Sequence, residues 1–283
     1  MTEQIPTSER MKPYSLVRLH ILRHAEKAGA NNTPAEADLR MPLTPEGKRQ
    51  AIEVGKEKGM RRPLASGGPS LRAHETALFA AAAHNPNVKG TETFDELLQT
   101  LDEDGLPYES RSWTNKHLDF PFKKGTTYHQ MLDDAYEKGI YLKTLVRLDD
   151  EAKATGERGE STYALQARNI AQIIERYTRI ASKIKEREDT KEPLERFLGT
   201  HGAIGESFLL EVLLRTKGKE ERDKFLESYP NGFDYAEGFD AEILSNGTIH
   251  LSLPEKEGKR GFDVVISSQI VGDIVRELPS ARV

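Results

Sequence analysis

Two kinds of hydrophobic periodicity alternate along the chain, and this alternation limits the possible folds most strongly. Val17, Leu19 and Ile21 alternate with two polar residues, which predicts a β-strand. In the segment 163–184, apolar residues instead recur at steps of four and three, as on one face of a helix. Strands that alternate with helices are typical of an α/β sandwich. We therefore predict an α/β fold of three layers, with a mainly parallel central sheet, helices on both faces and an inserted lid.

Capping and turn residues predict where the individual elements begin and end. Thr44 and Pro45 fit the N-cap and first position of a helix, and Asn246-Gly247 fits a hairpin turn. The expected helices cover residues 44–58, 70–84, 127–153 and 161–186, a stretch after His201-Gly202, and the end of the chain. The expected strands lie at 16–22, 63–65, 88–94, 196–200 and 262–267, with the hairpin at 241–253.

The length of the chain indicates one domain. With 283 residues, the chain can bury a core that needs no disulfide or structural metal. We assign residues 1–283 to a single domain, of which residues 1–13 form a loose N-terminal arm because they are polar and contain two prolines. Residues 95–127 show no sustained period, and a long segment of this kind is typically a functional lid. We expect this insert to cover the active site.

The composition excludes several classes of protein. The chain has no cysteine, which excludes a disulfide framework, thiolate metal ligands and a cysteine nucleophile. Lys and Arg total 41 against 46 Asp and Glu, for a formal charge of -5, so we expect neither a nucleic-acid nor a membrane partner. The first apolar run is too short to span a bilayer or to form a signal-peptide core. We expect a cytoplasmic protein.

Cationic and imidazole side chains follow the ends of several expected strands. Ligands of open α/β sheets bind beyond the carboxyl ends of the strands. Arg23 and His24 follow the first strand, Arg72 follows the second, and His201 follows a later one. Two guanidinium groups beside two imidazoles could enclose a tetrahedral dianion. His20 and His24 are four residues apart, but the β-strand pattern argues against the metal pair that this spacing gives on a helix.

Four short motifs strengthen this interpretation. They are LRHAEK at 22–27, LTPEGKRQA at 43–51, RAHETA at 72–77 and THG at 200–202. In this order they resemble the histidine phosphatase superfamily, also called phosphoglycerate-mutase-like, from about residue 16 to residue 247. The resemblance implies that His24 is the nucleophile and His201 the second catalytic histidine of the pocket. It also implies that Arg23 and Arg72 bind phosphate.

The resemblance implies further site residues where the motifs are less regular. Asn31 or Asn32 matches a phosphate contact found in many members. Ala25 stands where Gly is common, and Gly68 stands where Ser is common. Because Gly202 follows the second histidine, the chain resembles the branch whose general acid is a Glu after the third strand.

Several carboxyl groups are candidates for that general acid. They are Asp95, Glu96, Asp102, Glu103 and Asp104. The sequence Phe94-Asp95-Glu96 fits the apolar-x-Glu pattern of the branch, so we predict Glu96 as the acid. It would protonate the departing oxygen and later accept a proton from water.

The resemblance implies a phosphatase, that is, a phosphomonoester hydrolase that works through a covalent phosphohistidine on His24. Arg23, Arg72 and a protonated His201 are expected to stabilise the charge on the transferring group. His24 should donate from its other ring nitrogen to a backbone carbonyl, so that the attacking nitrogen is unprotonated. The expected partner is a small phosphorylated substrate, and no metal or organic cofactor is expected.

Two other functions fit the same residues. A mutase would return the phosphoryl group to another hydroxyl of the substrate, and phosphoglycerate mutases usually carry Ser and then Trp-Asn after the first motif. Here residues 27–30 are Lys-Ala-Gly-Ala, which favours hydrolysis. A non-catalytic phospholigand-binding protein of the same fold is the third interpretation, and the presence of both histidines and both arginines argues against it.

Overall fold

A computed structural model describes residues 12–29, 35–104, 116–118, 127–155, 163–187 and 192–278. Within these residues, one sheet has the strand order β2-β3-β1-β4-β5-β6. Its strands are β1 (Ser15–Arg23), β2 (Leu64–Gly67), β3 (Leu194–Thr200), β4 (Gly238–Leu244), β5 (Thr248–Leu253) and β6 (Phe262–Ser267). The pairs β2–β3 and β3–β1 are parallel. The pairs β1–β4, β4–β5 and β5–β6 are antiparallel. The parallel half therefore brings the carboxyl ends of three strands to one edge.

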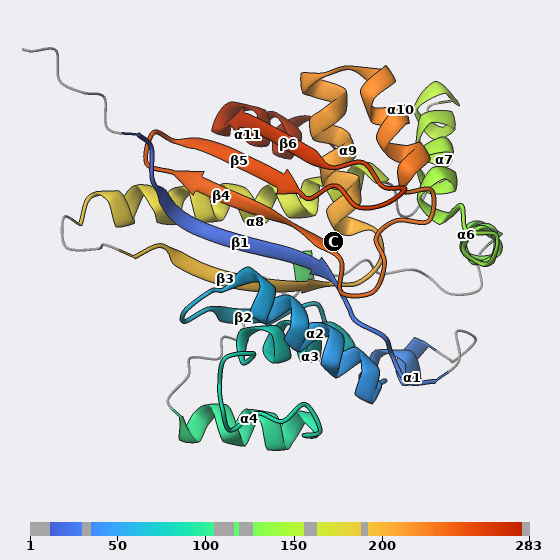
Figure 1. Cartoon of the computed structure of the whole chain (residues 1–283). Helices are drawn as coiled ribbons and strands as arrows, with labels where there is room; N and C mark the ends of the chain where they lie inside the picture. Colours follow the sequence, from blue (N-terminus) through green and yellow to red (C-terminus); the bar gives the residue numbers. More distant parts are fainter. Residues whose placement is uncertain are drawn as a thin grey trace, which may run out of the picture.

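Helices pack on both faces of this sheet, as Figure 1 shows. One face carries α2 (Pro45–Lys58) and α3 (Leu71–Ala81), which pack on each other, and α3 packs on β2 and β3. The other carries α8 (Tyr163–Lys185), α9 (Ile204–Thr216) and α11 (Ser268–Glu277). The remaining helices are α1 (Ala35–Leu39), α4 (Phe94–Glu103), α6 (Thr127–Glu137), α7 (Tyr141–Thr155) and α10 (Lys219–Ser228). The predicted three-layer α/β fold is confirmed, but the sheet is mixed rather than mainly parallel, because two of the five strand pairings among the described residues are parallel and three are antiparallel.

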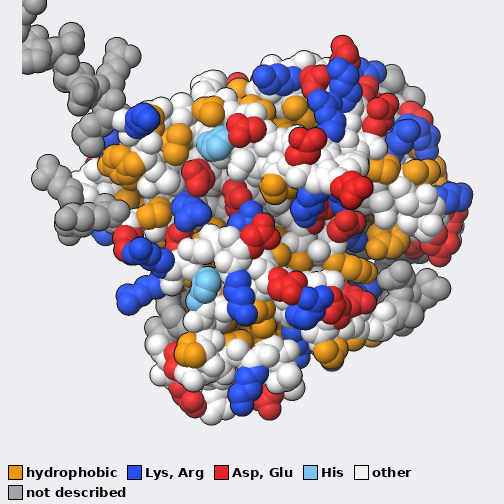
Figure 2. Space-filling model, in the orientation of Figure 1, with side chains coloured by type: hydrophobic (Ala, Val, Ile, Leu, Met, Phe, Trp, Pro, Cys, Tyr) orange, Lys and Arg blue, Asp and Glu red, His pale blue; other side chains and the backbone are white. Residues whose placement is uncertain are grey.

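Two hydrophobic cores lie on the two faces of the sheet. The larger includes Val17, Leu19 and Ile21 of β1 and the buried stripe of α8. The smaller includes Leu22 and the apolar side chains of α2, α3 and α4. Strands β4 and β5 bury alternate residues, because one of their faces packs on the core and the other is less covered. On the face seen in Figure 2, basic and acidic side chains are interspersed and form no large patch of one sign.

Most of the predicted elements are confirmed, because clear caps and turns mark their ends. The Thr44 hydroxyl accepts a hydrogen bond from Gly47 N at the start of α2, and Gly59 ends this helix with φ 58°. The expected hairpin is formed by β4 and β5. The last strand has the predicted bounds, Phe262–Ser267, and the terminal helix follows it.

Two predicted elements are wrong. The strand expected at 88–94 is absent from the described residues, because Thr93 and Glu96 form a capping box that starts α4 at Phe94. That helix also means that the first part of the insert 95–127 is regular. The single helix expected at 127–153 is divided into α6 and α7, because the chain between them turns at Gly139 with φ 70°.

Parts of other predictions lie outside the described residues. These are most of the N-terminal arm and much of the insert, at 105–115 and 119–126. Within the described part of the chain, no helix is long and apolar enough to cross a membrane.

Candidate active site

The parallel strands β1 and β3 bring the two predicted histidines together. Arg23 at the end of β1 is in register with Thr200 at the end of β3, so the residue that follows each strand lies at the same edge. The backbone N–H of His24 donates to the Thr200 carbonyl over 3.0 Å. The imidazole rings of His24 and His201 are stacked, with centroids 5.6 Å apart and planes 20° from parallel.

Strand β2 and helix α3 bring Arg72 to the same edge. Gly67 ends β2 in register with Gly199 of β3. A Cβ on Gly199 would lie 2.0 Å from the Ala73 carbonyl oxygen, so only glycine allows the first turn of α3 to approach this closely. Arg72, on that turn, is 1% exposed and reaches His201 with Nη2 to Nδ1 at 2.8 Å. Three segments far apart in the sequence thus form one pocket.

The hydrogen bond of His24 determines its tautomer. Its Nδ1 lies 2.9 Å from the backbone carbonyl oxygen of Ala25. A carbonyl can only accept, so Nδ1 carries the proton and the lone pair is on Nε2 when the ring is neutral. Burial lowers the pKa of His24 well below 6.5, and the positive charge of Arg72 lowers it further. The side chain therefore has the form that a nitrogen nucleophile requires.

His201 differs from the prediction in its charge. The guanidinium of Arg72 can only donate, so Nδ1 of His201 accepts and carries no proton. Burial and then the charge of Arg72 lower the pKa of His201 to about 3. The expectation of a protonated His201 is wrong for this state of the pocket. A neutral His201 retains an Nε2–H group that can donate to an anion.

Arg23 is held at the mouth of the pocket by groups from two other segments. Its Nη1 donates to the Phe233 carbonyl oxygen, and its Nη2 lies 3.3 Å from the Tyr136 hydroxyl. The rings of Tyr136 and Tyr235 lie 5.8 and 5.4 Å from its Cζ. The ring of Tyr235 is also 5.9 Å from that of His24. The guanidinium is thus oriented by one carbonyl and two aromatic rings.

Both arginines retain a buried donor without a partner among the described residues. These are Nε of Arg23 and Nε of Arg72. Ser70, which precedes α3, has a buried hydroxyl that also lacks a hydrogen-bond partner among the described residues. Buried polar groups are rarely left unpaired, so such donors beside two imidazoles indicate a binding site for an anion.

Asp38 is a residue of this pocket that the sequence interpretation missed. Its carboxylate contacts Arg72 Nη2 at 2.9 Å and Lys27 Nζ at 2.8 Å, and its backbone carbonyl accepts from Arg72 Nη1. Burial alone would raise the pKa of Asp38, but the Lys27 hydrogen bond and the Arg72 charge lower it to about 2. A carboxylate therefore occupies part of the guanidinium fork. The irregular sequence around α1 carried no signal for this contact.

The structure does not bring Glu96 to the other predicted site residues. Its carboxylate accepts from the backbone N–H and the hydroxyl of Thr93 at 2.7 and 2.9 Å, in the capping box of α4. These hydrogen bonds lower its pKa, and the side chain is exposed. The prediction assumed a Glu96 kept protonated by an anion-filled pocket with few carboxylates, and the exposed Glu96 of the helix cap is not in that environment. Asn31 and Asn32 lie outside the described residues.

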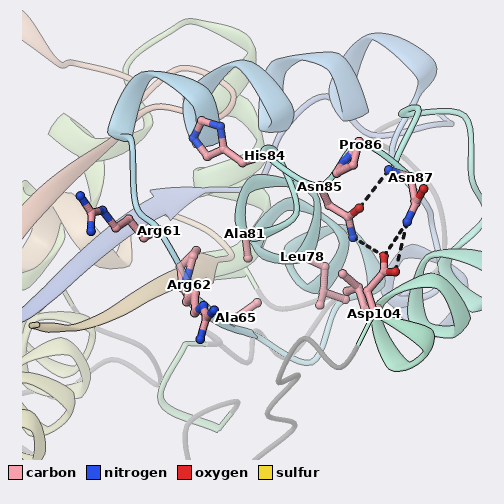
Figure 3. Close-up of a pocket in the computed structure, with 12 residues that line it drawn as sticks. Arg61, Arg62, Ala65, Leu78, Ala81, His84, Asn85, Pro86, Asn87 and Asp104 are labelled. Atoms are coloured by element: carbon pink, nitrogen blue, oxygen red, sulfur yellow. Dashed lines mark hydrogen bonds between the residues drawn. The ribbon is translucent and has the colours of Figure 1, made fainter.

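A separate cavity of about 340 Å³ lies at the other end of β2 (Figure 3). Its wall includes Arg61, which precedes β2, whereas Arg72 follows that strand. Asp104 also lines it and accepts hydrogen bonds from Asn85 and Asn87. The two sites therefore lie at opposite ends of β2, and this cavity is not part of the histidine pocket.

The sequence comparison agrees with this pocket. Residues 19–137 match the family model of the histidine phosphatase superfamily (branch 1). The resemblance to that superfamily is confirmed. The matched residues include His24, Arg23 and Arg72 and end before His201. Comparison with curated protein sequences gives no match.

Solved structures of phosphatases and related hydrolases are similar to this chain at low identity. A mycobacterial glucosyl-3-phosphoglycerate phosphatase is 16% identical, with 88% of this chain and 97% of that chain covered and a TM-score of 0.46. A mycobacterial hydrolase is 17% identical, with 93% and 98% covered and a TM-score of 0.46. A phosphoserine phosphatase from Entamoeba histolytica is 15% identical, with 90% and 99% covered and a TM-score of 0.38. Likeness at this level gives no information on the substrate.

Proposed function

We propose that the protein is a phosphatase that hydrolyses phosphomonoesters through a covalent phosphohistidine on His24. The observation that carries this proposal is the hydrogen bond from His24 Nδ1 to the Ala25 carbonyl. It leaves the lone pair on Nε2, and the lowered pKa keeps that nitrogen unprotonated near neutral pH. A histidine held only for structure has no need of a lone pair on Nε2 beside two guanidinium groups.

The transferring phosphoryl group would be held by the surrounding donors. In phosphoryl transfer the protein mainly positions the groups and stabilises charge on the equatorial oxygens. Arg23 and Arg72 offer charged N–H groups, and neutral His201 offers its Nε2–H. A phosphoryl group could bind the Nε–H of Arg72 directly, but at the Nη atoms it would compete with Asp38, because both Nη atoms are engaged with that residue.

The departing oxygen also needs a proton, which a carboxylic acid can supply. Glu96 stays the candidate from the sequence, with the capping contacts described above. Asp38 is the carboxyl group that the structure adds to the pocket, in contact with Arg72 and Lys27. A dianion bound at Arg72 would add negative charge close to Asp38 and so raise the pKa of that carboxyl group. These two residues are therefore compared in the leaving-group experiment of the Discussion.

The activity is tested with a panel of phosphorylated metabolites, sugars and peptides, by following the release of inorganic phosphate. We expect release from at least one class and none by His24→Gln, which removes the nucleophilic nitrogen. His20→Gln is a control for loss of a buried histidine, in the strand that precedes His24. Transfer to a second hydroxyl of the substrate without phosphate release would instead establish a mutase. Binding without turnover would establish a phospholigand-binding protein.

A further inference from the structure

A buried carboxyl group lies close to the pocket but has no role in the chemistry described so far. Glu206 is in the first turn of α9, five positions after His201 along the chain. Its side chain is 1% exposed, and its Oε2 atom has no hydrogen-bond partner among the described residues. A buried carboxyl group is costly to retain unless its contacts repay the loss of hydration.

A single peptide unit connects Glu206 to Arg23. Its Oε1 atom accepts from the backbone N–H of Phe233 over 2.6 Å. The carbonyl of the same residue accepts from Nη1 of Arg23. The preceding Gly232 has φ 85°, and a Cβ there would lie 2.7 Å from Oε1 of Glu206. The turn at 232–233 thus fits closely over the carboxyl group.

The same segment reaches the nucleophile. The N–H of Ala236 lies 3.4 Å from the His24 carbonyl oxygen, and the ring of Tyr235 packs near the His24 ring. Arg23 N donates to the Glu237 carbonyl over 2.8 Å. A shift of the 232–237 segment would therefore move the carbonyl that orients the Arg23 guanidinium.

From these contacts we propose that Glu206 is a positioning residue of the phosphate pocket, which fixes Arg23 through the peptide of Phe233. The inference rests on the proposed function only in taking Arg23 as a phosphate ligand. Glu206 itself touches no reacting atom. Loss of its carboxyl oxygen would leave Phe233 N–H buried without an acceptor, and the turn would have to move to satisfy it.

The ionisation of Glu206 gives this contact a second effect. Burial raises the pKa of Glu206 to about 7, against the opposing hydrogen bond from Phe233 and the charge of Arg23. The negative charge of Glu237 also raises the pKa of Glu206. The charge of Glu206 in turn raises the pKa of Tyr229. Below this value the group is neutral, and above it an additional negative charge lies near Arg23. Binding of a phosphate dianion should therefore weaken as pH rises through about 7.

The test is calorimetric binding of inorganic phosphate to the whole protein, wild type and variants. We expect Glu206→Ala to weaken binding by about tenfold or more, because the acceptor of Phe233 N–H is lost. Glu206→Gln keeps an acceptor and a neutral group, so binding should recover to within about threefold at pH 6. The phosphate affinity of Glu206→Gln divided by that of the wild type should then increase from pH 6 to about pH 8. Because both proteins bind the same phosphate at each pH, the titration of the ligand cancels in this ratio.

Glu211→Gln and Glu211→Ala are matched controls. Glu211 is a second buried carboxyl group on α9, and it bonds to Tyr163 and Arg215 rather than to the pocket. Both Glu211 variants should bind phosphate as wild type does, even where their melting temperature falls. If Glu206→Ala does not fold, the pH-dependent ratio for Glu206→Gln decides alone. Wild-type affinity in Glu206→Ala, or a ratio that does not change with pH, would overturn the inference. A wild type that binds no phosphate would refute the proposed function instead.

Discussion

The chemistry of the pocket depends on which nitrogen of each histidine carries a proton. His24 donates from Nδ1 to a carbonyl, whereas His201 accepts at Nδ1 from a guanidinium. The two stacked rings are therefore different tautomers, one with a lone pair on Nε2 and the other with an N–H there. In the proposed mechanism, the first ring would attack phosphorus and its neighbour would donate to an oxygen of the phosphoryl group.

The tautomer of His24 can be measured directly. We expect two-bond ¹H–¹⁵N spectra to show the Nδ1–H tautomer, still unprotonated at pH 6.5, because the folded-state pKa lies well below 6.5. If His24 is the nucleophile, as proposed, protonation would prevent attack, and the lowered pKa would keep it active on the acidic side of neutrality. The resonances are assigned by their loss in His24→Gln. In protein unfolded by urea, the same ring should titrate near its ordinary value. Titration of folded His24 near 6.5 would contradict the assignment.

At the scale of elements, α1 brings a carboxylate into contact with Arg72 of the histidine pocket. Asp38 lies against Arg72 and Lys27, with 14% of its side chain exposed. We expect Asp38→Ala to strengthen the binding of inorganic phosphate by about threefold or more, because a competing negative charge is removed from the guanidinium fork. Titration calorimetry measures the change. Asp95→Ala, an exposed carboxylate on α4, is the control. Weaker binding by the Asp38 variant would show instead that Asp38 orients Arg72 for phosphate.

Helix α4 allows the role of Glu96 to be separated from its position in a helix cap. Glu96→Ala should lower the melting temperature slightly, because a hydrogen bond of the capping box is lost. Glu96→Gln can retain the cap and cannot donate a carboxyl proton. Because Glu96 is engaged in the helix cap, we expect Glu96→Gln to lower the rates of hydrolysis of alkyl and aryl phosphates only slightly and by the same factor. A selective loss of activity on alkyl phosphates would identify Glu96 as the acid. The same selective loss in Asp38→Asn would assign that role to Asp38.

For the whole molecule, the sequence predicted the fold class and four pocket residues, because parallel strands bring residues beyond their ends to one edge. His24 and His201 are far apart in sequence, yet the register of β1 and β3 makes them neighbours. Periodicity and caps are local signals, and the position of strand ends follows from them. The same logic failed at 88–94, where the expected strand is absent from the described residues and a capping box starts α4 instead.

Contacts between irregular segments could not be predicted in this way. Asp38 reaches Arg72 from a five-residue helix, and Phe233 connects Glu206 to Arg23 through its backbone. Neither contact follows from a repeat or a cap, because both depend on how loops fold over the end of the sheet. The charge of His201 could not be predicted from the sequence either, because it depends on the distance to the Arg72 guanidinium.

The central claim is that His24 carries the phosphoryl group, and trapping the intermediate tests it most directly. The protein is mixed with a radiolabelled phosphoester that it hydrolyses, quenched in alkaline detergent because phosphohistidine is labile in acid, and digested for mass spectrometry. We predict label on the peptide that contains His24, on its Nε2 atom, and none in His24→Gln. His20→Gln should label as wild type does. Turnover of the ester with the label on another residue, or undiminished labelling of His24→Gln, would contradict the account.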